Sequence, residues 1–175
     1  MMKRILLLLI IFLAAASSGF AAEDKDANTY DSFKTYCGTE MAKVLDTYKG
    51  EQYSIEYKSK SNKPEYWTKT SENVDTAYGI EMQKATAQGE PDTGVLTVKQ
   101  TTAFYADNYG SEEGARAETT VAKTAKNVYK FYMSYQNQEW VLTKVRKYTH
   151  WQKKWHTIAP TSVFDILQSR NEVKQ

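Results

Sequence analysis

Cysteine is almost absent from this 175-residue chain, in which Cys37 stands alone. One cysteine excludes a disulfide within the chain, so packing must hold the fold together. With only two histidines besides, the chain offers few ligands for a transition metal, and we expect no metal site. The eight glycines are scattered and form no phosphate-binding loop, so we expect no nucleotide and no other cofactor.

Catalytic motifs are missing as well. No Gly-x-Ser-x-Gly elbow is present, and no cysteine-protease pattern surrounds Cys37. We therefore predict no catalytic residues. Cys37 lies on the apolar stripe of a predicted helix, which favours a small buried side chain, with an intermolecular disulfide as the alternative.

Long apolar runs are absent apart from one near the N-terminus, residues 5–16. Lys3 and Arg4 precede this run, and small residues, among them Gly19 and Ala21, follow it as a signal peptidase requires. The pattern predicts a signal peptide over residues 1–21, cleaved near Ala21, and export to the periplasm or the medium. Because the run is shorter than the roughly 20 residues that cross a bilayer, we expect no transmembrane anchor.

The chain also lacks an excess of one charge. Residues 1–21 hold two of the 23 basic residues and no acidic one, so the remainder carries 21 of each sign. This balance, together with export, argues against nucleic acid as a partner. Residues 123–175 nevertheless carry 10 basic against 3 acidic residues, which favours an acidic partner or an anionic ligand unless the two halves of the chain neutralise each other.

A clear helical pattern follows a polar segment, residues 22–28, that predicts a flexible start of the mature chain. From residue 30 to residue 48 the apolar residues recur every three or four positions, which places them on one face of an α-helix. The members of this stripe are Tyr30, Phe33, Cys37, Met41, Val44, Leu45 and Tyr48. The stripe must be covered by the rest of a single domain, residues 29–175.

Beyond residue 50 the composition favours strands. Alternating or β-branched segments predict strands over residues 53–57, 65–72 and 95–106. Residues 73–87 suit a strand slightly better than a helix, residues 115–127 suit either, and residues 161–171 predict a short C-terminal helix. The predicted fold class is α+β: an N-terminal amphipathic helix packed on a curved antiparallel sheet of five or six strands.

The best-defined hairpin covers residues 128–148, with Asn137 and Gln138 as a two-residue turn. That turn predicts four cross-strand pairs: Tyr135 with Trp140, Met133 with Leu142, Phe131 with Lys144, and Tyr129 with Arg146.

The second strand of this hairpin is predicted to stay extended through residue 156, which would place basic and aromatic side chains on one face. Such a face could bind an anionic ligand or an acidic protein through charge and cation–π contacts. The alternative is an ordinary solvated face on which lysine and arginine stems cover the rings. The predicted ligand- or partner-binding residues are Tyr129, Phe131, Lys144, Arg146, Tyr148, His150 and Lys154.

A long amphipathic helix, a meander and a closing hairpin that reads Gln138-Glu139-Trp140-Val141-Leu142 resemble the nuclear transport factor 2-like superfamily of cone-shaped α+β proteins. The resemblance implies a curved sheet wrapped around the helix and a pocket between them. It implies no activity, because the superfamily contains both enzymes and binding proteins. The chain differs from the usual pattern of this superfamily in two ways: only one helix is predicted before the sheet, and residues 151–158 form an extension. A lipocalin-like or half-barrel carrier would have a similar sequence pattern.

We expect an exported, non-enzymatic binding module that holds a small ligand in the concavity of its sheet or docks a protein partner through the basic aromatic strand. Two alternatives are a small cone-shaped hydrolase or isomerase, and an envelope protein that associates with itself through its tyrosine-rich strands.

We predict that the mature chain begins at Ala22. Intact-mass measurement of the exported protein should give the mass of residues 22–175, because the small residue at position 21 fits the signal-peptidase site. The substitution Ala21→Arg should block cleavage and leave a longer product in the membrane fraction. An exported protein that keeps all 175 residues would contradict the prediction.

Overall fold

The computed structural model describes residues 28–49, 53–59, 64–87, 89–106 and 109–168. The predicted signal peptide, residues 1–21, and most of the predicted flexible segment, residues 22–27, lie outside this part of the chain. Two compact units are present, Met1–Tyr36 and Cys37–Gln175. In the first unit residues 28–36 are helical; in the second the helix continues to residue 47 and a sheet follows.

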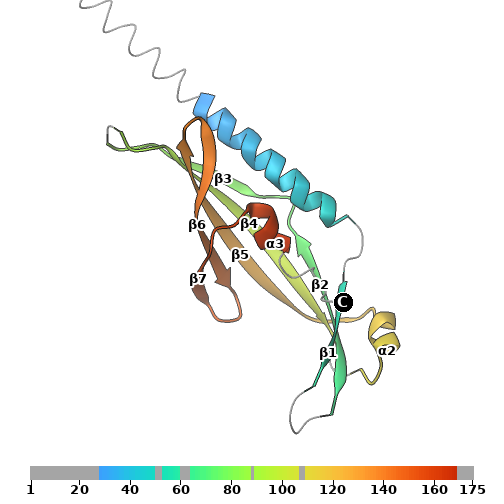
Figure 1. Ribbon diagram of the computed structural model, residues 1–175. Coiled ribbons are helices and arrows are strands. Elements are labelled where there is room, and N and C mark those ends of the chain that lie inside the picture. Colours follow the sequence, from blue (N-terminus) through green and yellow to red (C-terminus); the bar gives the residue numbers. More distant parts are fainter. Residues whose placement is uncertain (1–27, 50–52, 60–63, 88, 107–108, 169–175) are drawn as a thin grey trace, which may run out of the picture. The chain divides into compact units, whose positions relative to one another are not determined.

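The second unit is built on a curved, open, antiparallel sheet of seven strands, with the strand order β1-β2-β4-β5-β6-β7 and with β3 also paired to β4 (Figure 1). The α+β class is confirmed, and the predicted count of five or six strands is wrong. The strands are β1 (Tyr53–Lys58), β2 (Tyr66–Val74), β3 (Gly79–Gln83), β4 (Thr93–Tyr105), β5 (Val121–Gln136), β6 (Glu139–Thr149) and β7 (Lys154–Ile158). The short helices are α2 (Glu112–Ala117) and α3 (Val163–Gln168).

A break at residue 75 separates β2 from β3. Strands β2 and β3 pair with the same edge of β4, one after the other. Between them the amide of Asp75 donates to the carbonyl of Lys99 (2.9 Å), while its carboxylate accepts from the amide of Ala77 (3.0 Å). This aspartate turn interrupts the extended chain. The strand favoured for residues 73–87 is confirmed as β3, although it is shorter than that range and residues 73 and 74 belong to the end of β2.

A strand that was not predicted separately, β7, begins where the chain turns back after β6. The amide of Gln152 donates to the carbonyl of Thr149 (3.1 Å), and Lys153 takes a φ of 49°. Strand β7 then pairs with β6, so the strand predicted to run straight through residue 156 is wrong. The turn escapes notice in the sequence because it uses a left-handed lysine instead of the usual glycine or asparagine.

The core lies on the inner face of the sheet, which we define as the face of Gln100 and Tyr129. Side chains alternate between the two faces of a strand, so every second residue of β4 and β5 points inward. Fully buried apolar residues come from the sheet, from the second-unit part of the N-terminal helix and from α3. They include Leu96, Val98, Phe131, Met133 and Val145; Cys37, Met41 and Val44; and Val163 and Leu167.

A buried amide joins these elements. The side chain of Gln100 is 3% exposed and accepts a hydrogen bond at Oε1 from the Tyr129 hydroxyl (3.0 Å). Its Nε2 group lies within hydrogen-bonding distance of three acceptors: the Tyr48 hydroxyl (3.3 Å), the Glu72 carboxylate (3.2 Å) and the Leu167 carbonyl (3.4 Å). The hydroxyl of Tyr48 in turn donates to the Leu167 carbonyl (2.7 Å). The hydrogen bonds of Gln100 thus connect the end of the N-terminal helix, the sheet and α3.

On the outer face, α2 packs against β1 and β2. Lys69 of β2 is only 7% exposed, and its ammonium donates to the carbonyls of Arg116 (3.0 Å) and Glu118 (2.6 Å) at the end of α2. The same ammonium lies over the rings of Tyr53 (4.4 Å) and Tyr105 (4.7 Å). A cation at the C-terminus of a helix satisfies carbonyls that have no partner within the helix.

The C-terminal helix α3 agrees with its prediction over the described residues. Ser162 caps it, because its hydroxyl accepts from the amide of Asp165 (2.9 Å). No helix among the described residues is both long enough and apolar enough to cross a membrane.

We predict that Gln100→Leu lowers the free energy of unfolding by about 1–3 kcal/mol, because it removes buried hydrogen bonds, among them the one from the Tyr129 hydroxyl. Urea denaturation of the purified protein measures the change. The matched control is Gln136→Leu at the exposed end of β5, which should change the stability by less than about 0.5 kcal/mol. Equal effects of the two substitutions would contradict the role of Gln100.

We predict that the thiol of Cys37 is unreactive in the folded protein. The expectation that this residue is buried is confirmed, and burial, with a smaller contribution from Glu40, raises the pKa of the thiol to about 12. At pH 8 a maleimide should therefore label the protein only after denaturation. Because the folded state holds the proton more tightly, stability should fall above about pH 9, and Cys37→Ala should reduce that fall. Rapid labelling of the folded protein at pH 8 would contradict this.

Candidate functional site

The predicted binding residues do not share one face of the sheet. The turn at Asn137 and Gln138 forms as predicted, with φ of 51° and 67°, and the first two predicted pairs form beyond it. A bulge between residues 132 and 133 then shifts the register, so Phe131 faces Val145 and Tyr129 faces Lys147. The predicted pairs of Phe131 with Lys144 and of Tyr129 with Arg146 are therefore wrong.

The shift separates the aromatic residues from the basic ones. Tyr129 and Phe131 are buried on the inner face, where Tyr129 belongs to the Gln100 network. Lys144 and Arg146 lie on the outer face, since one extra residue in a strand inverts the orientation of all that follow. A sequence pattern does not reveal a bulge, so the facing residues could not be deduced from the turn alone.

On the outer face the basic groups lie over rings. Lys144 Nζ is 5.6 Å from the centroid of Tyr132, and the Arg146 guanidinium is 5.2 Å from that of Trp155. The ring of Tyr148 lies 5.4 Å from that of Trp155 and 6.3 Å from that of His150. These four predicted residues, Lys144, Arg146, Tyr148 and His150, are thus close together, in contacts that a solvated sheet face also makes. Lys154 is opposite Thr149 and belongs with the inner face.

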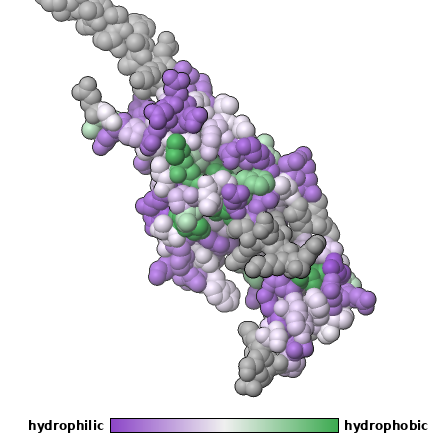
Figure 2. All heavy atoms as spheres, viewed as in Figure 1, coloured by the Kyte–Doolittle hydropathy of each residue, from purple (hydrophilic) through white to green (hydrophobic). Residues whose placement is uncertain are grey.

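The inner face holds a groove beyond the Gln100 network, which we call the inner groove. It consists of two adjoining hollows of about 570 and 430 Å³. Both are lined by Thr102, Phe104 and Lys123, so they form one continuous depression across β1, β2, β4, β5 and β6. Figure 2 shows a mostly hydrophilic surface on the face of the molecule that is in view, with hydrophobic residues in small patches.

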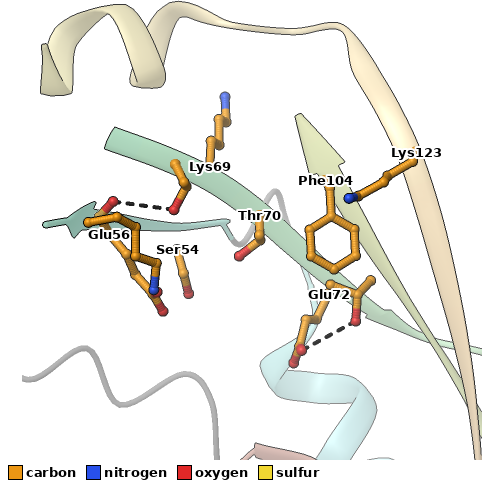
Figure 3. Close-up of a pocket in the computed structure, with 10 residues that line it drawn as sticks. Ser54, Glu56, Lys69, Thr70, Glu72, Phe104 and Lys123 are labelled. Carbon is orange, nitrogen blue, oxygen red and sulfur yellow. Dashed lines mark hydrogen bonds and ion pairs between the residues drawn. The ribbon is translucent and has the colours of Figure 1, made fainter. Parts of the chain in front are cut away.

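The β1–β2 half of the inner groove is rich in hydroxyl and carboxylate groups. Figure 3 shows Thr70 and Glu72 directed into the hollow, whereas Lys69 points away from it toward α2. Glu72 accepts from Thr102 (3.4 Å) in addition to Gln100, and Glu56 forms an ion pair with Lys58. The further lining residues of this half are Ser54 and Thr68.

The β5–β6 half is basic and aromatic. Lys123 Nζ lies 5.1 Å from the centroid of Phe104 and 5.5 Å from that of Trp151, whose side chain belongs to a residue that is 78% exposed. Lys147 lines the same hollow, and its ammonium lies 5.0 Å from the centroid of Tyr129. The remaining lining residues are Thr124, Ala125, Asn127, Thr149 and Gln152. Of the residues that the structure describes, no aspartate or glutamate lines this half.

Sequence reasoning did not find this cluster. Phe104, Lys123 and Trp151 are far apart in the sequence and meet only because β5 lies between β4 and β6. Residues 121–127, which read Val-Ala-Lys-Thr-Ala-Lys-Asn, show no alternation of apolar and polar residues that would indicate a strand. Trp151 was assigned to a straight strand that the structure replaces with a turn.

The inner groove brings polar groups of several kinds together. Hydroxyls, amides, ammonium groups and carboxylates from five adjacent strands point into one open depression. Among the described residues, no group of three or more histidine, cysteine, aspartate or glutamate side chains is placed to hold a metal ion. We found no family model, curated protein or solved structure that matches the chain.

Proposed function

We propose that the protein is an exported binding protein that holds a small polar ligand in the inner groove. The observation that carries this proposal is the continuity of the two hollows, whose shared wall is formed by Thr102, Phe104 and Lys123. Their volumes fall in the range of about 300–1,000 Å³ that is typical of small-molecule sites.

The placement of the groove on a sheet supports the proposal. Neighbouring strands fix their side chains through the ladder of backbone hydrogen bonds, so the groove is shaped before a ligand arrives. Behind it, Lys69 joins β2 to α2, and beside it the Gln100 network holds Glu72 and Thr102. Export and the resemblance to the nuclear transport factor 2-like superfamily stay predictions from the sequence, and both agree with a carrier of this kind.

A second candidate function is the docking of an acidic protein on the outer face. It is favoured by the position of Lys144, which is exposed, and of Arg146 and Tyr148, which are half-buried, on one side of β6. We rank it below ligand binding because the contacts of this face are ones that an ordinary solvated sheet face also makes.

We predict that a small molecule co-purifies with the exported protein and is lost when the inner groove is filled. Native mass spectrometry of the purified protein measures the bound mass. The substitution Thr70→Trp places an indole in the β1–β2 half and should reduce occupancy at least about tenfold. The matched control, Thr157→Trp, puts the same side chain on the outer face of β7 and should keep the ligand.

Three outcomes would contradict ligand binding in the groove: wild-type protein without a bound molecule, a ligand retained by Thr70→Trp, and a ligand lost equally in both variants. A bound protein that Thr70→Trp retains and the double variant Lys144→Ala/Arg146→Ala loses would establish the docking function instead.

A further inference from the structure

We propose that the β5–β6 half of the inner groove binds an acidic sugar, so that the ligand is a small oligosaccharide bearing a carboxylate. This inference rests on the proposed function and specifies its ligand. Three properties of this half carry it: an ammonium that no carboxylate of the described residues neutralises, an exposed indole beside that ammonium, and a lining of neutral groups that both donate and accept hydrogen bonds.

The ammonium is that of Lys123. Among the described residues no aspartate or glutamate lies within ion-pair distance of it, and the contacts that define its position are with the rings of Phe104 and Trp151. A lysine over a ring keeps part of its charge open to an anion on the other side. Lys147 adds a second positive charge to the same hollow. An anionic group on the ligand is therefore favoured here.

The indole is that of Trp151. Its residue is 78% exposed at the rim of the hollow, although a tryptophan usually buries most of its surface. A flat ring that remains open beside a polar hollow offers apolar contact to the carbon-bound face of a sugar. A bare inorganic anion would make no use of it.

The neutral lining distinguishes a sugar from an apolar acid. Thr149 supplies a hydroxyl, and Asn127 and Gln152 supply amides. Each of these groups both donates and accepts, as sugar hydroxyls do. A fatty acid or an aromatic carboxylate would leave them without partners, at a cost for every group removed from water.

The different charges of the two halves favour one orientation of the bound ligand in the inner groove. Within the part of the chain that the structure describes, Glu56 and Glu72 line the β1–β2 half, and no carboxylate lines the β5–β6 half. A carboxylate is therefore favoured beside Lys123 and disfavoured near Glu72, where carboxylates can instead accept from sugar hydroxyls. An oligosaccharide with its acidic residue at the Lys123 end satisfies both halves.

The test is calorimetric titration of the purified exported protein with trigalacturonic acid. Two further probes separate the contributions: the neutral trisaccharide galactotriose, which has the rings without the charge, and citrate, which has the charge without the rings. We expect trigalacturonic acid to bind at least about tenfold more tightly than either, with an affinity that falls as salt is raised.

Variants locate the site. Lys123→Met should weaken the binding of trigalacturonic acid roughly 10- to 100-fold and flatten its salt dependence. Trp151→Ala should weaken it about tenfold. The matched control is Lys126→Met, which removes the same charge from the opposite face of the same strand and should change the affinity less than twofold.

Each contrary result overturns the inference. Equal weakening by Lys123→Met and Lys126→Met would show charge attraction without a site. Citrate or galactotriose binding as tightly as trigalacturonic acid, or no binding by any of the three, would exclude an acidic sugar. The proposed function fails separately: if a co-purified ligand is lost in Thr70→Trp while none of the three probes binds, the groove is a binding site for another class of ligand.

Discussion

The buried amide of Gln100 is the constraint on which the second unit depends. Gln100 lies on β4 between the buried apolar core and the inner groove. Its hydrogen bonds reach β2, β5, α3 and the end of the N-terminal helix. A buried amide without partners is costly, so these elements must stay together for the chain to remain folded. The same bonds fix the carboxylate of Glu72 at the edge of the inner groove. Stability and the shape of the candidate site therefore share one network.

The groove exists because the sheet is covered on different faces at its two ends. Residues of the N-terminal helix and α3 bury the apolar inner side chains of β4 to β6, such as Val98 and Phe131. At the other end α2 covers the outer face instead, held by Lys69, and the inner side chains there are polar, as in Thr70 and Glu72. A polar inner face has no tendency to draw in a covering helix. The inner face at this end therefore stays uncovered and forms the hollow, while α2 packs against the outer face behind it.

Local patterns predicted the elements better than their pairing. The helix stripe with Cys37, the two-residue turn at Asn137 and the short C-terminal helix depend on neighbouring residues, and the structure confirms each of them over the described residues. The bulge beside Met133 and the left-handed turn at Lys153 have no strong local signal, and both were missed. Because side chains alternate along a strand, a single missed bulge moved Lys144 and Arg146 to the face opposite Phe131.

By itself the sequence determined the α+β class, the helix that supplies part of the core, most strand positions and the absence of an internal disulfide, because these follow from composition and from periodicity within short segments. Tertiary structure alone decided which strands are neighbours and which face each side chain takes. That decision separated Tyr129 and Phe131 from Lys144 and Arg146, and it brought Lys123 together with Phe104 and Trp151. The physical reason is that a site made by five strands depends on register and bulges, which long-range packing sets and no single segment encodes.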